Sequence, residues 1–199
     1  MELLLATFNL DKARELERLL ALPGIRLRSL WEFECAKAPE ETGTTLVENA
    51  RLKAEYAVRL TGMPAIADDT GLEVDALDGR PGVYAARYAG PGATYDDNVK
   101  KLLHELRDVP RARRTARFRT VIVARLQERE IVAEGTLDGV ITEAPRGTNG
   151  FGYDPVFELP ELGRTLAELS AEEKNQRSHR ARAAQALAAK LTDLTTEAR

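Results

Sequence analysis

The hydrophobic and polar residues of this chain alternate between the spacing of strands and the spacing of helices. Short apolar or alternating runs predict strands, and apolar residues three or four positions apart predict helices. The predicted strands are Leu3 to Ala6, Ile25 to Leu30, Ile66-Ala67, Leu72 to Leu77, Arg117 to Gln127, Ile131 to Val140 and Pro155 to Leu159. The predicted helices contain Ala13 to Leu20, Val47 to Ala57, Asn98 to Leu106 and Ala171 to about Leu194.

Capping and turn residues set the limits of these elements. The residues that mark helix ends are Thr45 with Glu48, Ser170 with Glu173, and Pro23-Gly24. Residues 78–92 and 144–154 are rich in glycine and are predicted to be loops. The two long runs after residue 117 follow each other closely, which predicts a hairpin. The order of elements therefore predicts an α/β fold with a mixed sheet.

Two adjacent acids, Asp68 and Asp69, stand at the end of an apolar strand, and we expect the chain to turn at Gly71. Adjacent carboxylates repel each other and need a cation or hydrogen-bond donors to stay ionised away from water. A hard divalent cation with oxygen ligands is the natural partner. The alternative is a solvated Asp-Asp turn, because aspartate favours turns through bonds to its own backbone.

Length, charge and cysteine content narrow the class of protein. The 199 residues predict one domain, or one domain with a lobe, and show no repeat or obvious linker. The net charge of −3, from 29 basic and 32 acidic residues, argues against nucleic acid or an anionic membrane as a partner. The single cysteine, Cys35, forms no intrachain disulfide and favours a reducing compartment. No apolar run reaches the roughly 20 residues that span a bilayer, and the first residues lack a signal peptide's basic start, so we expect a cytoplasmic protein.

The first candidate for chemistry is residues 7–12, where a strand gives way to a helix. Thr7 and Asn9 supply hydroxyl and amide groups, and Lys12 lies in the opening turns of the helix. Free backbone N–H groups and the helix dipole favour an anion here, so this turn is a candidate phosphate site. In the alternative, Asn9 or Asp11 is an ordinary N-cap.

The second candidate comprises the acids before residue 45 and the helix that follows. Glu40 or Glu41 could share a metal ion with Asp69. Lys53 lies four residues after Asn49, which places both on one helix face. In the alternative, these residues form a surface loop and a solvated helix face.

The third candidate is the glycine-rich segment 147–155. Its glycines let the backbone approach a ligand closely, and Phe151 and Tyr153 offer flat surfaces to a base. Asp154 can fix an orientation by hydrogen bonds. In the alternative, the segment is a hairpin loop whose aromatic rings lie in the core.

The fourth candidate lies on the C-terminal helix. Lys174, Ser178 and His179 can converge on one side of this helix, and Arg180 can reach beyond it. In the alternative, these residues are a charged, solvated helix face.

Six motifs occur in a fixed order over nearly the whole chain. They are Thr7-x-Asn9-x-x-Lys12, Glu41-Thr42-Gly43 with Glu48-Asn49-Ala50 and Lys53, Ala67-Asp68-Asp69-Thr70-Gly71-Leu72, Pro81-Gly82-Val83-Tyr84-Ala85-Ala86-Arg87-Tyr88, Gly150-Phe151-Gly152-Tyr153-Asp154-Pro155, and Glu173-Lys174-Asn175 with Ser178-His179-Arg180. Together they resemble the inosine triphosphatase family, pyrophosphatases that remove non-standard purine nucleoside triphosphates. Thr70 stands where this family often has serine, and Phe8 and Asp11 stand where it often has glycine.

The resemblance implies an α/β fold in which an elongated mixed β-sheet is flanked by helices, with two lobes around a central cleft. It implies a single nucleoside triphosphate pyrophosphatase domain over residues 1–199. It also implies Mg²⁺-dependent hydrolysis of ITP, dITP and XTP to the monophosphate and pyrophosphate, by a homodimer. We expect residues 78–92 in the dimer interface, because Val83, Tyr84 and Tyr88 would be costly to leave in water.

The resemblance also implies roles for single residues. Asp69 is the proton acceptor and, with Glu40, a metal ligand; Glu41 is the rival of Glu40, and Asp68 supports the site. The residues implied at the triphosphate are Thr7, Phe8, Asn9, Leu10, Asp11, Lys12, Lys53 and Thr70, and those at the nucleoside are Phe151, Gly152, Tyr153, Asp154, Lys174, His179 and Arg180.

Hydrogen-bond donors at the purine would determine the choice of base. His179 or Arg180 as donors would favour a 6-oxo group, which accepts hydrogen bonds, over the donating amino group of adenine. Two other classes stay open. One is a pyrophosphatase of related fold acting on modified pyrimidine nucleotides, which a substrate panel would separate. The other is a nucleotide- or RNA-binding module without catalysis, and a salt-insensitive affinity for free nucleotide would argue against RNA.

Overall fold

A computed structural model of the chain describes residues 2–21, 24–33, 37–127 and 129–197, with residues 193–197 described by their backbone alone. Cys35 and Pro23, on which two of the predictions above depend, lie outside these residues. Residue contacts divide the chain into two units, which we describe separately. Unit 1 comprises residues 1–69, 120–135 and 179–199, and unit 2 comprises residues 70–119 and 136–178.

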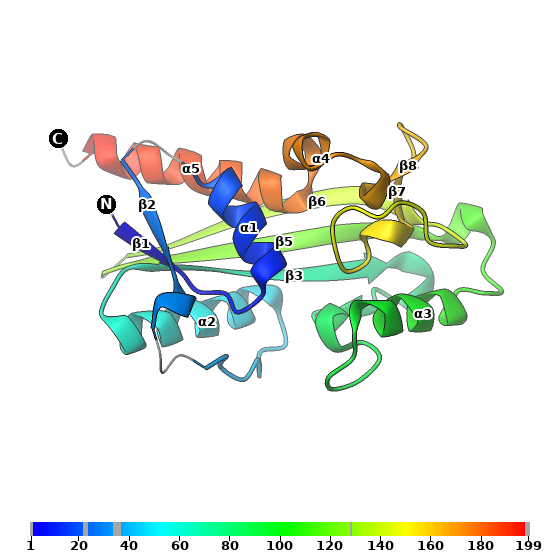
Figure 1. Cartoon of the computed structure of the whole chain (residues 1–199), viewed down its shortest axis with the longest axis horizontal. Helices are drawn as coiled ribbons and strands as arrows, with labels where there is room; N and C mark the ends of the chain where they lie inside the picture. Colours follow the sequence, from blue (N-terminus) through cyan, green and yellow to red (C-terminus); the bar gives the residue numbers. More distant parts are fainter. Residues whose placement is uncertain (1, 22–23, 34–36, 128, 198–199) are drawn as a thin grey trace. The chain divides into compact units, whose positions relative to one another are not determined.

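The secondary structure is a mixed sheet with helices. The strands are β1 (Glu2–Leu5), β2 (Arg26–Ser29), β3 (Ala65–Val74), β4 (Pro81–Gly82), β5 (Thr115–Leu126), β6 (Arg129–Ile141), β7 (Phe157–Leu159) and β8 (Arg164–Thr165), and the helices are α1 (Leu10–Leu19), α2 (Leu46–Thr61), α3 (Tyr95–Glu105), α4 (Ala171–Arg177) and α5 (His179–Glu197) (Figure 1). The sheet has eight strands in the order β2-β1-β3-β5-β6-β7-β8, with β4 paired to β3. Parallel pairs join β1 to β2 and β3, and antiparallel pairs join β7 to β6 and β8. The predicted α/β fold with a mixed sheet is confirmed.

In unit 1, helices cover both faces of the sheet. Helices α1 and α5 lie side by side on one face, and α2 lies on the other (Figure 1). The apolar face of α1, with Leu16 and Leu20 fully buried, packs with Leu187 of α5 against Ile66 of β3 and Ile122 of β5. Burying a side chain of this size stabilises the fold by about 1.5–3 kcal/mol. This packing fixes the start of α1 beside the middle of β3.

In unit 2, α3 and the short segments after β6 share a second apolar core. Leu102 and Leu106, in and just after α3, are fully buried with Leu72 of β3, and the rings of Phe118 and Phe157 lie 4.6 Å apart. Thr94 caps α3 in a reciprocal bond with Asp97, which fixes where that helix begins. Helix α3 starts three residues before the predicted position, because this capping box precedes the apolar pattern.

Two predictions about single elements are wrong. The chain does not turn at Gly71: Asp68, Asp69 and Thr70 lie inside one continuous strand, β3. A glycine within a strand is compatible with extended backbone, so Gly71 is no sign of a turn there. The predicted C-terminal helix is two helices, because Ser178 is extended (φ −63°, ψ 156°) and separates α4 from α5. Unit 2 ends at Ser178.

Other predictions hold. The hairpin is confirmed, since β5 and β6 are neighbours joined by two residues, a connection that only antiparallel strands allow. The capping boxes at Thr45 and Ser170 both form.

In the loop 78–92, Tyr88 does not need the dimer interface that we expected to shield it from water. Tyr88 is buried within unit 2, where its hydroxyl donates a 2.6 Å bond to Glu105, so it needs no partner chain to leave water. Tyr84 of the same loop is 52% exposed.

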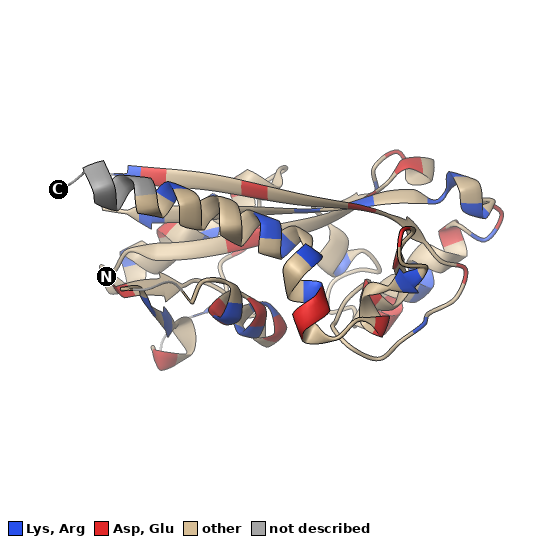
Figure 2. Ribbon diagram, turned by 90° about the horizontal axis from the view of Figure 1, so that it is seen from above, with Lys and Arg blue, Asp and Glu red and all other residues tan. Residues whose placement is uncertain are grey.

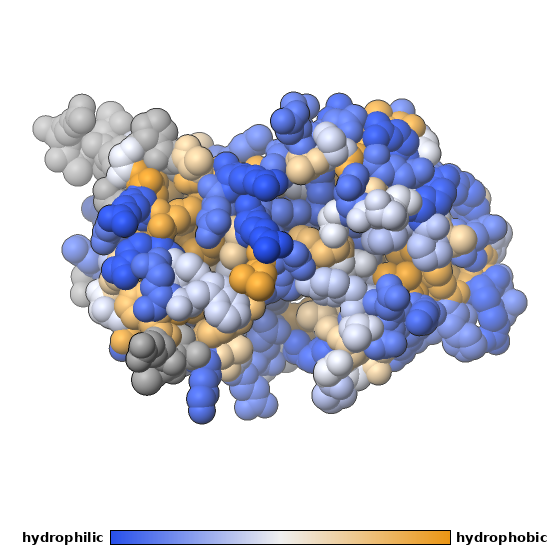
Figure 3. Space-filling view, viewed as in Figure 1, coloured by the Kyte–Doolittle hydropathy of each residue, from blue (hydrophilic) through white to orange (hydrophobic). Residues whose placement is uncertain are grey.

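Charged and apolar groups are mixed on the surface. Basic and acidic residues, blue and red in Figure 2, are scattered along the ribbon among other residues. The face drawn in Figure 3 is mostly hydrophilic, with apolar side chains in separate groups. Among the described residues, no helix is both long and apolar enough to cross a bilayer.

Candidate functional site

The two adjacent acids of β3 point to opposite faces of the sheet. Successive side chains of a strand alternate in direction, so Asp68 and Asp69 are forced apart. Asp68 meets Lys12 of α1 and Arg180 of α5, and Asp69 meets Lys53 of α2. Each carboxylate therefore has its own cation, and the pair does not converge on one ion as the sequence suggests.

On the α2 face, Asp69 is held by two donors. Lys53 Nζ lies 2.9 Å from Oδ1 of Asp69, and Asn49 Nδ2 donates to Oδ2 at 3.3 Å. Both donors come from one face of α2, as their spacing of four residues predicts. Lys53 Nζ also lies 3.1 Å from Glu41, so its ammonium joins the two acids. Burial lowers the pKa of Lys53, but the charges of Asp69, Asp68 and Glu41 outweigh burial and raise it above its ordinary value.

The loop before α2 is tied to the same residues. The backbone N–H of Gly43 donates to Asn49 at 2.8 Å, and a Cβ at Gly43 would lie only 2.6 Å from that amide oxygen. Glycine is therefore needed for this close approach. The structure brings Glu41 to Lys53, whereas Glu40, the metal ligand that the resemblance favours, is exposed.

On the other face, Asp68 lies in a buried group of charges. Its Oδ2 is 3.3 Å from Lys12 Nζ and 3.3 Å from Arg180 Nε, and Nη1 of Arg180 is 2.5 Å from Glu15 of α1. Burial raises the pKa of Asp68, but the charges of Lys12, Arg180 and Lys53 outweigh burial and hold the pKa well below its ordinary value. Burial lowers the pKa of Lys12 in spite of Asp68.

The start of α1 is capped by its own sequence. Asn9 is the N-cap, and its side chain accepts bonds from the backbone N–H groups of Asp11 and Lys12 at 3.0 and 3.1 Å. The hydroxyl of Thr7 accepts a bond from Asn9 N, and Leu10 is half-exposed. The N-cap alternative is thus correct for Asn9, and two of the N–H groups expected to bind phosphate are bonded to it. The ammonium group of Lys12, in the first turn of α1, pairs with Asp68.

The third candidate segment forms a compact group in unit 2. Asp154 is buried, accepts a 2.9 Å bond from Phe151 N, and pairs with the buried Lys174 at 2.5 Å. The Lys174 ammonium lies 4.9 Å from the centre of the Phe151 ring. Tyr153 is in the core, as the loop alternative had it, and donates to Ala85 O at 2.8 Å. Gly152 adopts positive φ between these two aromatic residues.

The predicted site residues therefore form two groups. Unit 1 holds the triphosphate group except Thr70, together with His179 and Arg180 from the start of α5; unit 2 holds Thr70, Phe151 to Asp154, and Lys174. His179 and Arg180 are both buried. Because α4 and α5 are separate helices, the predicted convergence of Lys174 with His179 on one helix does not occur.

The sequence analysis did not predict two residues that lie beside these groups. Glu15 lies three residues after Lys12 on the same face of α1, a spacing that could have shown it. Tyr95 of α3 lies 5.8 Å, ring to ring, from Phe151, and only the fold brings these distant residues together.

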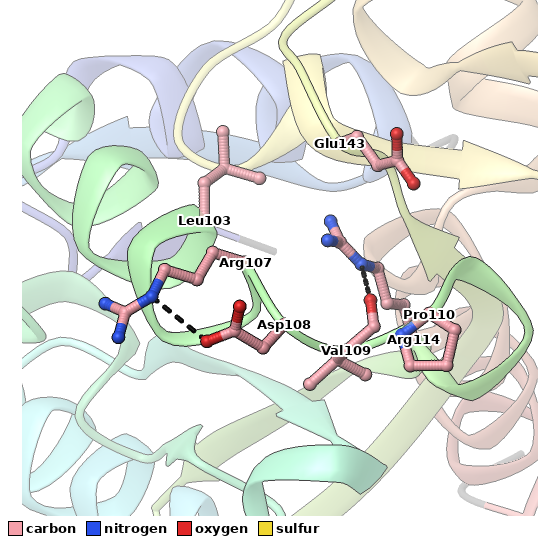
Figure 4. A pocket seen from close by; sticks show the side chains of 7 residues that line it. All are labelled: Leu103, Arg107, Asp108, Val109, Pro110, Arg114 and Glu143. Carbon is pink, nitrogen blue, oxygen red and sulfur yellow. Dashed lines mark hydrogen bonds and ion pairs between the residues drawn. The ribbon is translucent and has the colours of Figure 1, made fainter.

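A separate hollow of about 490 Å³ lies in unit 2, away from the predicted residues (Figure 4). Arg114 faces it, and its guanidinium donates to Leu106 O, Val109 O and Thr142 O. The first of these carbonyls follows α3, so Arg114 stabilises the negative end of this helix. The acids Asp108 and Glu143 line the same hollow. Arg114 therefore has a structural role there.

Comparison with known proteins agrees with the motifs. The Ham1 family model matches residues 3–190. The chain belongs to the Ham1 family. A dITP/XTP pyrophosphatase of Geobacillus kaustophilus is 54% identical over 92% of this chain and 90% of its own length. One of Thioalkalivibrio sulfidiphilus is 50% identical over 96% and 98%. Among solved structures, a HAM1 protein from Coxiella burnetii is 42% identical, covers 97% of this chain and 99% of its own, and has a TM-score of 0.88.

Proposed function

We propose that this Ham1 protein hydrolyses non-standard purine nucleoside triphosphates, namely ITP, dITP and XTP, to the monophosphate and pyrophosphate. Relatives that are half identical over nearly their whole length are dITP/XTP pyrophosphatases. The observation that carries the proposal is the pair of acids joined by Lys53, with Asp69 at 2.9 Å and Glu41 at 3.1 Å from its ammonium nitrogen. Two such carboxylates can hold a divalent cation, which would balance the charge on a triphosphate.

The acids suit Mg²⁺ as the cofactor. Among the described residues, no three His, Cys, Asp or Glu side chains gather as a complete metal site. Mg²⁺ does not need one, because it commonly binds one or two carboxylates together with substrate phosphates and water. Asp69 with Glu41 or Glu40 would hold Mg²⁺. Without the metal ion, the ammonium of Lys53, which is positive like Mg²⁺, holds Asp69 and Glu41 in place. When bound, Mg²⁺ would neutralise charge on the phosphate oxygens.

The residues of the chain divide the remaining work. Asp69 accepts the proton of the attacking water, since Asn49 and Lys53 fix its orientation. Lys12 and Lys53 attract the triphosphate, whose reaction depends mainly on positioning and charge neutralisation.

The group in unit 2 would hold the purine. The face of Phe151 offers a surface for stacking, and Asp154 holds both its backbone and Lys174. The ammonium N–H groups of Lys174 would favour a 6-oxo purine, because adenine presents a donor at that position.

A substrate panel tests this proposal. We expect kcat/KM for ITP, dITP and XTP with Mg²⁺ to exceed that for ATP by about a hundredfold or more, the discrimination that a mispaired buried polar group can give. A preference for modified pyrimidine nucleotides would instead indicate a pyrophosphatase of related fold that acts on pyrimidines. Binding of nucleotides without turnover would indicate a binding module.

A further inference from the structure

A buried chain of charges runs from Glu15 to Lys12 through two residues distant in sequence. Arg180 is 1% exposed, and its guanidinium is shared between Glu15 at 2.5 Å and Asp68 at 3.3 Å. Lys12 Nζ lies 3.3 Å from the same Oδ2 atom of Asp68 that Arg180 Nε approaches. Two cations thus depend on one carboxylate oxygen, and Glu15 is the second acid that balances them.

The geometry points to Glu15 as a positioning residue for the triphosphate end of the site, acting through Arg180 and Asp68 on Lys12. This inference rests on the proposed function, in which Lys12 binds phosphate. Glu15 reaches the site through Arg180, so its role is to position other residues and not to take part in the chemistry. Its contribution is to hold one side of Arg180 and leave Asp68 available to Lys12.

The packing of α1 against α5 brings Glu15 and Arg180 together. Glu15 and Lys12 are three residues apart on α1, and Arg180 lies in the first turn of α5, which packs beside α1 (Figure 1). Buried charges need complete pairing, because an uncompensated one is strongly unfavourable. Asp68 and Glu15 are the two acids whose charges act on Arg180, so if Glu15 loses its charge, Arg180 competes more strongly with Lys12 for Asp68.

Positioning and simple charge balance predict opposite results for Glu15→Gln. Removing a negative charge near Lys12 should by itself strengthen the binding of a polyanion. Misplacing Lys12 should weaken it, by about tenfold or more, since small displacements of a binding group are costly. The base-free ligand tripolyphosphate separates these effects from any effect on the purine.

The experiment compares Glu15→Gln with Glu17→Gln, an exposed glutamate of the same helix. The Kd of tripolyphosphate is measured by calorimetry with Mg²⁺, and KM and kcat for XTP and GTP are measured on the same preparations after thermal melting confirms folding. We expect Glu15→Gln to raise the Kd and the KM for XTP about tenfold, with the XTP-to-GTP ratio unchanged. Glu17→Gln should behave as wild type, and Glu15→Asp, which keeps the charge, should recover part of the loss.

Three results would overturn the inference. The first is a Kd of tripolyphosphate for folded Glu15→Gln that equals the wild-type Kd. The second is a Kd lower than that of the wild type. The third is a changed ratio of the kinetic constants for XTP and GTP with normal tripolyphosphate binding, which would indicate that Arg180 contacts the base. If wild type hydrolyses no purine triphosphate, the proposed function fails. The comparison of tripolyphosphate affinities still tests the role of Glu15 in that case.

Discussion

At the scale of single residues, the neighbouring aspartates of β3 have different surroundings and should have different roles. Asp69 lies between Asn49 and Lys53 and near Glu41, whereas Asp68 lies deep between Lys12 and Arg180. The alternation of side chains in a strand creates this difference. Substitution of each should therefore give a distinct result.

Replacing Asp69 should affect turnover. Asp69→Asn keeps the shape of the side chain but removes its charge and its basicity, so we expect kcat to fall by about 10²–10⁴-fold. Melting temperature and kcat are measured on the same preparation, with the exposed Asp96→Asn on α3 as the control. A folded Asp69→Asn protein that keeps half of the wild-type kcat would show that the chemistry lies elsewhere.

Replacing Asp68 should affect stability more than turnover per folded molecule. Asp68→Asn leaves Lys12 and Arg180 buried with one acid fewer, and breaking a buried pair in this way costs about 3–5 kcal/mol. Urea unfolding of Asp68→Asn and of the exposed Asp96→Asn measures the difference. Equal unfolding midpoints for these two variants would contradict the account of the buried charges.

The acids before α2 can be told apart by their dependence on Mg²⁺. Glu41 lies at Lys53, and Glu40 is exposed. We therefore expect Glu41→Gln to raise the Mg²⁺ concentration needed for half-maximal activity more than Glu40→Gln does. A larger increase in this Mg²⁺ concentration for Glu40→Gln would instead indicate that Glu40, the residue that the family resemblance favours, is the metal ligand.

At the scale of elements, the sequence predicts what local rules determine. The caps at Thr45 and Ser170, the hairpin of β5 and β6, and the common face of Asn49 and Lys53 all follow from spacing. The break at Ser178 and the continuous strand through Gly71 do not, because tertiary packing overrides weak local preference there.

The site was predictable as a set of residue types and only partly as a set of contacts. Motif order predicts Lys12, Lys53 and Asp69 as site residues, but the sequence alone does not show that Asp68 lies on the face opposite to Asp69, because this depends on the strand continuing through both residues. The pairing of Arg180 with Glu15 joins residues 165 positions apart, so it depends on how α1 and α5 pack.

The contact between β6 and α5 offers a test of that packing. A Cβ at Gly135 would clash with the backbone at His179 and Ala183 of α5. We expect Gly135→Ala to destabilise the protein by about 1–3 kcal/mol, because backbone must move to make room. Unfolding in urea measures the loss, and Glu134→Ala, at the exposed neighbouring position, is the control. An unchanged midpoint for Gly135→Ala would contradict this close approach.

The Tyr88–Glu105 bond in unit 2 predicts a dependence on alkaline pH. Burial, together with the bond to Glu105, raises the pKa of Tyr88 from 10.0 to about 12. The fold thus favours the neutral phenol, and its contribution to stability is full below pH 10 and is lost as the pH rises through 12. The stability difference between wild type and Tyr88→Phe should therefore shrink between pH 10 and 12. A constant difference across that range, or the same trend in Tyr84→Phe, would contradict this assignment.

At the scale of the whole molecule, we propose a homodimer, as the family resemblance implies. Tyr84 remains 52% exposed in the loop 78–92, and its ring lies 5.1 Å from the guanidinium carbon of Arg87. Light scattering at micromolar concentration should give twice the mass of 22.0 kDa. We expect Tyr84→Asp to shift this mass toward the monomer, because it buries a charge in the interface. A monomeric wild type would refute the assembly.

The products formed from XTP and dITP show which phosphoanhydride bond the protein hydrolyses. Wild-type protein is incubated with each nucleotide and Mg²⁺, and the products are separated by anion-exchange chromatography and assayed for pyrophosphate. Because we assign attack at the α–β bond, we predict equal amounts of nucleoside monophosphate and pyrophosphate from the first turnovers. Nucleoside diphosphate with orthophosphate as the primary products would contradict the account.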